Sequence, residues 1–316
     1  MQAFSVADSF VTVAPIIIII AIGYVMGRMK VLGSGFVMEE NRLNYYLGFP
    51  LLLFCSTLGA DIKSLFDWKL VAYSMASIFV MAVAGYVIFG KIADKKQQGA
   101  LTTTAFRSDI LLFAVFISGK LFGSDGLALA AMMTAFISPT VTILSIVILN
   151  RLDGNAKKGP GILESMKTVV ANPFVIVVIV GILYNLSGLP FPEVIEDSLS
   201  DIGSIAIPLS LLSIGVQLDF KNVVKERFLL FVGVVTRLVI VPAVFITGAA
   251  LLGFKGNSIA CLFAQYAAPA TVSCYTFARQ MNSDEQLTGN IVVFSTVFSP
   301  FTIFIGLLIL ANLGLI

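Results

Sequence analysis

The sequence predicts an all-α integral membrane protein in which ten transmembrane helices form two inverted five-helix repeats. Three observations support this fold class: apolar segments of membrane-spanning length fill the chain, its two halves match in register, and two segments are interrupted at membrane depth. Of the 316 residues, 58% are hydrophobic and 12% are charged, whereas soluble domains carry about 25% charged residues. Together with a mean hydropathy of +0.98, this composition excludes an ordinary soluble domain.

The composition also excludes several kinds of functional site. Because the chain has no histidine, it cannot hold a His-based catalytic triad, a His-ligated haem or an HExxH zinc site. Cys55, Cys261 and Cys274 lie in apolar segments without CxxC spacing and are interpreted as packing residues. The net charge of +2 is spread over loops, so no nucleic-acid partner is expected. We expect neither a cofactor nor an enzymatic activity.

Hydropathy predicts ten spans, each near the ~20 residues that a bilayer requires. The first ten residues contain Asp8 and no Lys or Arg, unlike the basic start of a signal peptide, so the first apolar run is expected to remain as a membrane helix. The predicted spans cover about residues 9–28, 37–58, 68–91, 99–120, 126–150, 167–187, 200–218, 227–252, 257–280 and 286–313.

The distribution of basic residues among the loops predicts the orientation. The odd-numbered loops hold 14 Lys and Arg residues and the even-numbered loops hold four. Cytoplasmic loops carry the excess of Lys and Arg, so the odd-numbered loops are expected in the cytoplasm. With ten spans, both termini of this multi-pass protein then lie outside the cytoplasmic membrane.

An internal duplication is the next feature. The segment 50–63 matches 208–221 at a shift of 158, with Asp61 over Asp219, and Ala14-Pro15…Gly23 matches Asn172-Pro173…Gly181 at the same shift. Five spans per half is an odd number, so the second half must enter the membrane inverted. The predicted units are a first repeat over 1–150, a cytoplasmic linker over 151–167 and a second repeat over 168–316.

Two of the spans carry groups that are unusual at membrane depth. The fourth contains Arg107 and Asp109, and charges there cost about 2.5–3.5 kcal/mol each on insertion scales. The ninth contains Pro269, which removes a backbone donor and favours a break. A shift of 159 places Asp109 and Pro269 close to each other in the repeat. We therefore predict that the two spans are broken and cross near these residues, where secondary transporters bind substrate.

A structural alternative accounts for the same residues without a binding site. In it, Arg107 extends to the nearer membrane surface, Asp109 caps the following helix, and Pro269 makes a simple kink. In the functional interpretation an unwound segment lets Arg107 and Asp109 face one cavity. The polar residues weighed within the spans are Asn44, Arg107, Asp109, Gln217, Arg237, Gln265, Tyr266, Ser273 and Asn290.

Not all of these residues are assigned to the binding site. Arg237 and Asn290 are interpreted as structural, and Asn44 and Gln217 are equally suited to interhelical hydrogen bonds worth about 0.6 kcal/mol. The predicted substrate- and ion-binding residues are Arg107, Asp109, Gln265, Tyr266, Pro269, Ser273, Asn44 and Gln217. No metal cluster is expected, although Na⁺ near Asp109 is considered.

Taken in order, several motifs resemble those of the auxin efflux carrier family, which also includes malate and malonate permeases. The motifs are LGFPLLLF in the second span, AFRSD in the fourth, ANPF in the sixth, IPLSLLSIGVQL in the seventh, and AAPA with FARQ in the ninth. The chain departs from the family pattern at Asp109, where Asn is common, and near Phe116, where a crossover proline is missing.

The resemblance implies a ten-helix carrier with broken, crossing helices four and nine, on the plan of sodium–proton antiporters and bile-acid transporters. It further implies a scaffold part, a moving part and an organic-anion substrate. The expected function is transport of a small carboxylate such as malate, malonate or an auxin-like acid across the cytoplasmic membrane by alternating access, with H⁺ or Na⁺ coupling. The alternative is a cation/proton antiporter that uses Asp109 as its ion site. The expected partners are the anion, the coupling ion, the lipid bilayer and a second copy of the chain in a homodimer.

Overall fold

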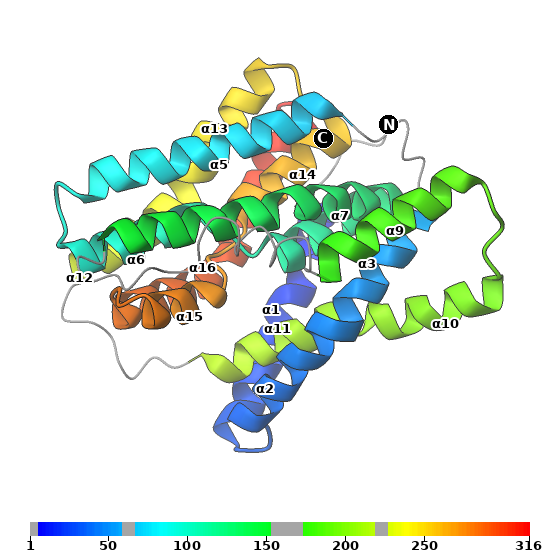
Figure 1. The fold of residues 1–316 in the computed structure, drawn as a ribbon, viewed down its shortest axis with the longest axis horizontal. Coiled ribbons are helices and arrows are strands. Elements are labelled where there is room, and N and C mark those ends of the chain that lie inside the picture. The colour runs from blue at the N-terminus through cyan, green and yellow to red at the C-terminus, as the bar shows by residue number, and fades with distance from the viewer. Residues whose placement is uncertain (1–5, 59–66, 153–172, 219–226) are drawn as a thin grey trace.

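A computed structural model of the chain describes residues 6–58, 67–152, 173–218 and 227–316, and the regular elements in these ranges are helices (Figure 1). Most of the predicted linker, and the matched residues Asp61 and Asp219, lie outside the described residues. The first half contains the helices α1 (Val6–Arg28), α2 (Ser34–Leu43), α3 (Phe49–Leu58), α5 (Trp68–Phe89), α6 (Lys95–Phe106) and α7 (Ile110–Leu152), with a π-helix, η1 (Asn44–Gly48), between α2 and α3.

The second half also contains both long and interrupted helices. It contains α9 (Pro173–Ser187), α10 (Glu193–Ser204), α11 (Ala206–Gln217), α12 (Arg227–Val235), the π-helix η2 (Thr236–Ile240), α13 (Val241–Leu251), α14 (Gly256–Ala267), α15 (Ser273–Gln280) and α16 (Glu285–Asn312). Helix α7 consists of two helical segments that meet at a kink, where Gly123 has a positive φ of 58°. This conformation suits glycine, and it joins two helices that the sequence predicts as the fourth and fifth spans.

Six described segments are long and apolar enough to cross a membrane. They are 10–28, 68–89, 110–152, 193–217, 227–251 and 285–312. The regular elements of the described residues are thus helices, and several have the length and composition of membrane-spanning helices. The predicted spans near 37–58, 99–120, 167–187 and 257–280 fall on helices that are shorter, interrupted or only partly described.

The seventh of the ten predicted spans begins earlier in the structure than the sequence predicts. The expected span was 200–218, but helix α10 already starts at Glu193. Acidic residues in its first turns lower the local hydropathy, and these same residues stabilise the positive end of a helix. The hydropathy pattern therefore excluded a stretch that is nevertheless helical.

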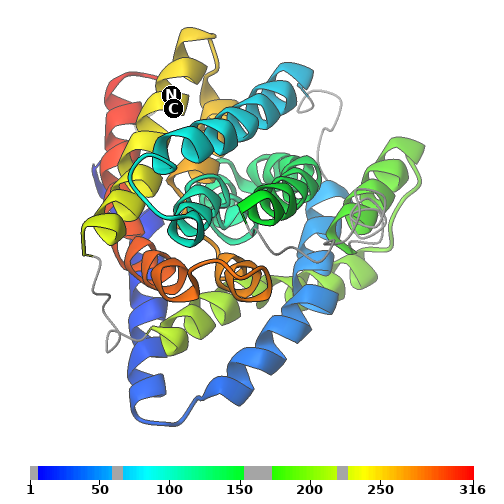
Figure 2. The same ribbon diagram turned by 60° about the vertical axis from the view of Figure 1, so that its left-hand side comes forward.

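The helices pack in two groups, which we call the first group (α1, η1, α2, α3, α9, α10 and α11) and the second group (α5, α6, α7, η2 and α12 to α16). The most extensive contacts lie within the groups: α1 with α11 and α3 with α9 in the first, α7 with α14 and α5 with α6 in the second. Figure 2 shows α3 and α9 toward the right and α13 and α16 toward the left, with α5 across the top. Contacts of α1 with α16, and of α3 with α7, join the two groups.

Glycines allow two close helix approaches in the first group. A Cβ atom at Gly23 of α1 would collide with the carbonyl oxygen of Leu212 in α11. A Cβ atom at Gly181 of α9 would collide with the hydroxyl of Thr57 and contact Phe54 in α3. Small residues permit such close packing between membrane helices.

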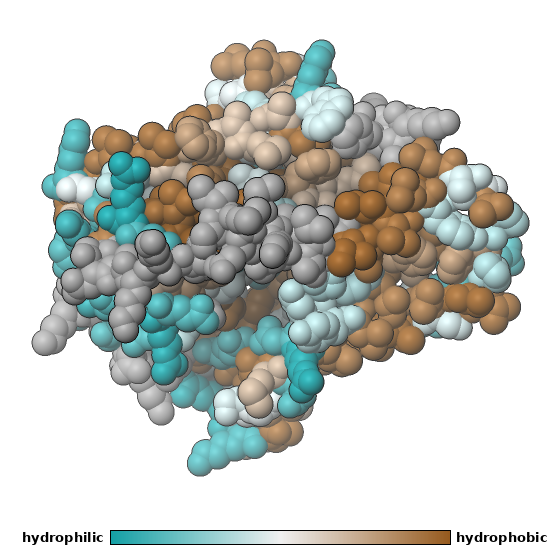
Figure 3. Space-filling view, viewed as in Figure 1, coloured by the Kyte–Doolittle hydropathy of each residue, from teal (hydrophilic) through white to brown (hydrophobic). Residues whose placement is uncertain are grey.

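The outer surface carries many large apolar side chains. Phe79, Val83 and Val87 of α5 and Phe301 and Ile305 of α16 are about half exposed. In Figure 3, apolar side chains cover the broad right-hand part of the molecule, whereas charged side chains gather at the left and lower edges. A surface of this kind is stable against lipid and unstable in water.

Candidate functional site

Both predicted interruptions are present. Helix α6 ends at Phe106 and α7 begins at Ile110, while α14 ends at Ala267 and α15 begins at Ser273. The two extended stretches pair with each other through an antiparallel bridge between Ser108 and Ala270. The backbone N–H of Asp109 donates to the carbonyl of Pro269 at 3.0 Å, and that of Thr271 donates to Arg107 at 3.4 Å. Each break thus supplies backbone partners that the other has lost, as non-helical backbone at membrane depth requires.

Arg237 donates hydrogen bonds to further backbone carbonyls at this crossing. Its side chain is 0% exposed and lies in η2; π-helical turns are frequent at functional sites. The guanidinium donates three hydrogen bonds to backbone carbonyls: Nε to Ala268 at 2.7 Å, Nη1 to Ala105 at 2.9 Å and Nη2 to Gln265 at 2.9 Å. These carbonyls belong to the ends of α6 and α14. A cation is favourable there because helix C-termini carry partial negative charge.

Arg107 is buried beside the crossing, with 8% of its surface exposed. Its Nε donates to the hydroxyl of Ser273 at 2.9 Å, and Nη1 lies 3.3 Å from the hydroxyl of Ser145. Its guanidinium carbon is 4.4 Å from the ring centre of Phe277, a cation–π contact. The alternative in which Arg107 extends to the surface is therefore wrong.

Asp109 immediately precedes the first residue of α7. Its backbone carbonyl accepts a hydrogen bond from the N–H of Phe113, in the first turn of α7, at 3.0 Å. This is the N-cap position, where an acidic side chain meets the positive end of the helix. Asp109 thus occupies the capping position of the structural alternative, and it also lines a cavity.

The cavity, which we call the crossing cavity, measures about 370 Å³ and lies between the two helix groups. The first group contributes Asn44 of η1 and Gln217 of α11, and the second contributes Asp109 and Ser273. Four of the predicted site residues therefore line one space. Arg107 is not among the residues that line this cavity; its side chain packs toward Ser273 and Ser145.

Sequence reasoning missed Glu40, a further residue of the crossing cavity. Its side chain is 3% exposed, and its Oε1 atom accepts hydrogen bonds from Asn44 Nδ2 at 2.6 Å and Ser210 Oγ at 2.9 Å. Asn44 Nδ2 also donates to the carbonyl of Ala206 at 2.9 Å. In the sequence Glu40 follows Glu39 at the edge of a span, where a solvated pair of carboxylates is the ordinary interpretation. Only Glu39 is exposed.

Three other predicted site residues do not line the crossing cavity. Gln265 Oε1 accepts a hydrogen bond from Ser74 Oγ at 2.8 Å, and the hydroxyl of Tyr266 bonds with that of Ser77, so both side chains face α5. Pro269 contributes its carbonyl to the crossing. These residues position the broken helices and are not brought to the cavity.

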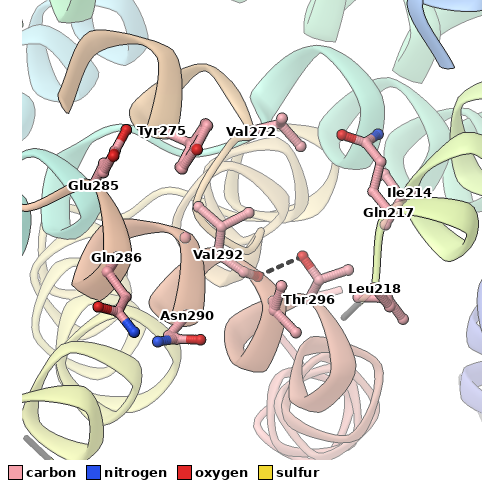
Figure 4. Close-up of a pocket in the computed structure, with 12 residues that line it drawn as sticks. Ile214, Gln217, Leu218, Val272, Tyr275, Glu285, Gln286, Asn290, Val292 and Thr296 are labelled. Carbon is pink, nitrogen blue, oxygen red and sulfur yellow. Dashed lines mark hydrogen bonds between the residues drawn. The ribbon is translucent and has the colours of Figure 1, made fainter. Parts of the chain in front are cut away.

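A second cavity of about 570 Å³ borders the crossing cavity at Ile214, Gln217 and Val272. It lies between the end of α11, the start of α15 and the start of α16. Figure 4 shows Gln217 at one end, Tyr275 and Glu285 at the other, and Val292 and Thr296 between them. We call this space the outer cavity.

Comparison with known proteins identifies the family. Residues 8–306 match a family described as "Membrane transport protein". An "Uncharacterized transporter" of Methanothermobacter thermautotrophicus is 24% identical over 91% of this chain and 94% of its own length. A "Probable auxin efflux carrier component 5b" of Oryza sativa subsp. japonica is 27% identical over 42% of this chain and 37% of its own length. The chain therefore belongs to this family of membrane transport proteins, the auxin efflux carrier family.

Proposed function

We propose that the protein is a secondary transporter that moves a small organic anion, such as malate, malonate or an auxin-like acid, across the cytoplasmic membrane. The observation that carries this proposal is the N-terminal end of α15, where Thr271, Val272 and Ser273 line the crossing cavity. The N–H groups of Cys274 and Tyr275 donate to the carbonyls of Thr271 and Val272, whereas those of Val272 and Ser273 have no backbone acceptor among the described residues, as is usual at the start of a helix. Together with the helix dipole, they favour a negatively charged ligand.

The groups around this helix end suit a carboxylate. Thr271 and Ser273 add hydroxyl groups, and Ser273 accepts a hydrogen bond from the Arg107 guanidinium at 2.9 Å. Arg107 thereby polarises the hydroxyl without entering the cavity. At the start of α7, in contrast, Asp109 already supplies a carboxylate. The α15 end is therefore the proposed site for the carboxylate of the substrate.

Alternating access would use the two helix groups as scaffold and moving part. The crossing cavity has walls from both groups, so a relative displacement of the groups changes its walls. Ten spans in two inverted repeats would give this arrangement. The close contacts of Gly23 with Leu212 and of Gly181 with Phe54 support the duplication, because Gly181 lies 158 positions after Gly23 and Leu212 lies 158 positions after Phe54.

The proposed orientation places residues 151–167 in the cytoplasm and both termini outside. Single cysteines introduced at Asn155 and Glu193, in a variant lacking the three native cysteines, should react with membrane-impermeant reagents from opposite sides. Glu193 should react from the exterior. Reaction of both from the same side would disprove the orientation and the inverted repeat together.

The transport proposal is tested by uptake into proteoliposomes that contain the purified full-length chain. A panel of radiolabelled monocarboxylates and dicarboxylates would be presented with and without H⁺ and Na⁺ gradients. We expect saturable uptake of at least one acid, competed by its unlabelled form. Vesicles with the Ser273→Ala variant should show a raised KM for that acid. Absence of saturable uptake for every acid, with correctly folded protein, would contradict the proposal.

A further inference from the structure

We propose that the crossing cavity contains a binding site for a single monovalent positive charge, a proton or Na⁺, formed by Glu40 of the first helix group and Asp109 of the second. The role of this site in coupling rests on the proposed transport function, but the presence of the site does not. It extends the sequence-based expectation of an ion near Asp109 by a second carboxylate, and it predicts that the ion links the two helix groups.

The excess of negative charge in the crossing cavity is the first feature that supports a cation site. Both carboxylates line the same space, and neither forms an ion pair within the described part of the chain. Lys and Arg side chains are absent from the described residues that line it. Glu40 is buried and Asp109 is partly buried, and burial of an ionised carboxylate is costly unless a positive charge accompanies it. An organic anion entering this space would add a further negative charge.

The second feature is that the crossing cavity contains oxygen atoms available to bind a cation. Glu40 is 3% exposed, and both of its hydrogen bonds go to Oε1, which leaves Oε2 without one in the described residues. Ser213 also lines the cavity and is 1% exposed, and its hydroxyl has no hydrogen-bond partner among the described residues. Carboxylate, hydroxyl and amide oxygens are the donors that hard cations prefer. A buried hydroxyl without a partner, in a cavity that is also lined by two carboxylates, is suited to bind such a cation.

The surrounding titratable groups are few. Tyr45 of η1 also lines the cavity, and Arg107 contacts it indirectly through Ser273 of α15. The walls formed by α9 and α11 contribute no titratable side chain among the described residues. Glu40 and Asp109 are therefore the two groups whose charge a proton or a metal cation would change.

The position of the two carboxylates has a mechanical consequence. Because they belong to different helix groups, their mutual repulsion opposes the arrangement that brings them to one cavity. A bound cation removes this repulsion and stabilises the arrangement in which both carboxylates line one cavity. Cation binding would therefore bias the conformational equilibrium and also make the α15 end more favourable for an anion.

The test measures cation binding to the purified full-length protein in the absence of any organic anion. Binding of ²²Na⁺ is compared in the wild type, Glu40→Gln and Asp109→Asn, with Glu39→Gln as the matched control because Glu39 is the exposed neighbour. The proton is tested in a second arm, as the pH dependence of the thermal unfolding temperature in Na⁺-free buffer. Size-exclusion chromatography verifies that each variant is folded. Ser213→Ala keeps both carboxylates and provides a further variant if Glu40→Gln does not fold.

We expect one of two supporting results. If Na⁺ is the ligand, Glu40→Gln and Asp109→Asn each weaken Na⁺ binding at least tenfold, Ser213→Ala weakens it about threefold, and Glu39→Gln leaves it unchanged. If the proton is the ligand, the wild type shows a pH-dependent unfolding temperature that Glu40→Gln and Asp109→Asn flatten and Glu39→Gln preserves. The proposal is overturned if neither dependence exists, or if Glu39→Gln changes it as much as Glu40→Gln. Anion uptake that persists in that case would leave the transport function standing.

Discussion

The two broken helices differ in how they are closed, although they pair with each other. The break between α6 and α7 is built from the charged residues Arg107 and Asp109, and a carboxylate occupies the start of the following helix. The break between α14 and α15 is uncharged, contains Pro269 and ends at the hydroxyl of Ser273. One helix N-terminus thus carries its own anion, whereas the other offers polar groups to a ligand.

This difference suggests two separate tasks for the two breaks, which lie side by side at the crossing. The uncharged end at α15 suits the carboxylate of a substrate, and the acidic end at α7 suits a cation. Arg237 holds both breaks at once through the carbonyls of Ala105, Gln265 and Ala268. The comparison predicts that substitutions at the crossing, at the acidic end and at the uncharged end have different consequences.

The largest effect is expected at Arg237. Arg237→Met would leave three buried carbonyls unpaired, at about 1–3 kcal/mol for each, so the thermal unfolding temperature of the purified protein should fall by many degrees. Arg237→Lys keeps the positive charge, but an ammonium group cannot donate to all three carbonyls as the planar guanidinium does. Its unfolding temperature should lie between those of the wild type and Arg237→Met. Arg151→Met, an exposed arginine in the last turn of α7, is the control. Equal unfolding temperatures for Arg237→Met and the control would show that the crossing does not depend on this side chain.

The next effect concerns the charge at the acidic end. An ionised Asp109 opposes an anionic substrate, so wild-type uptake should increase as the pH falls or as Na⁺ is added, by about tenfold. Asp109→Asn retains a capping side chain but has no charge to neutralise, and its uptake should be nearly independent of both. Initial rates of uptake across a pH and Na⁺ series measure this. Parallel profiles in the wild type and Asp109→Asn would assign Asp109 to helix capping alone.

A smaller effect, on the KM for the anion, is expected at Ser145, which contacts Arg107. Ser145→Ala removes one partner of Arg107 at 3.3 Å but leaves the partner that lines the cavity. Because Arg107 keeps Ser273 and Phe277, the KM for the anion should rise no more than about threefold, equivalent to about 0.6 kcal/mol. A much larger increase, measured in the same uptake assay, would mean that Ser145 itself belongs to the substrate path.

Features of the fold that depend on apolar pattern and on broken periodicity could be predicted from the sequence. The positions of the membrane segments, and the interruptions at Asp109 and Pro269, follow from residues whose cost in a bilayer helix is known. The structure breaks the fourth segment even though it lacks the proline near Phe116, because Arg107 and Asp109 and the pairing with the ninth segment are sufficient. The two π-helices could not be predicted, since no sequence pattern marks the one-residue shift in hydrogen bonding that places Asn44 and Arg237.

The candidate site was only partly predictable for a related reason. Asn44, Asp109, Gln217 and Ser273 line the crossing cavity as polar residues in apolar spans suggest, whereas Gln265 and Tyr266 are used for packing against α5. Glu40 follows the exposed Glu39 in the sequence, and only the packing of α2 against α11 distinguishes the two residues. Which polar group faces a cavity depends on helix rotation, which a single sequence leaves undetermined.

The most direct test of the different tasks of the two breaks is a side-by-side measurement of Ser273→Ala and Asp109→Asn in proteoliposomes. The KM for the transported anion is measured at saturating Na⁺ and mildly acidic pH, and the dependence on cation is then measured at saturating anion. We predict that Ser273→Ala raises the KM for the anion about tenfold, as loss of a hydrogen bond linked to a charged group implies, and retains the dependence on cation. Asp109→Asn should keep the KM within about twofold and lose the dependence on cation. If both variants change both quantities by similar factors, the two breaks form a single undivided site and the division of tasks is wrong.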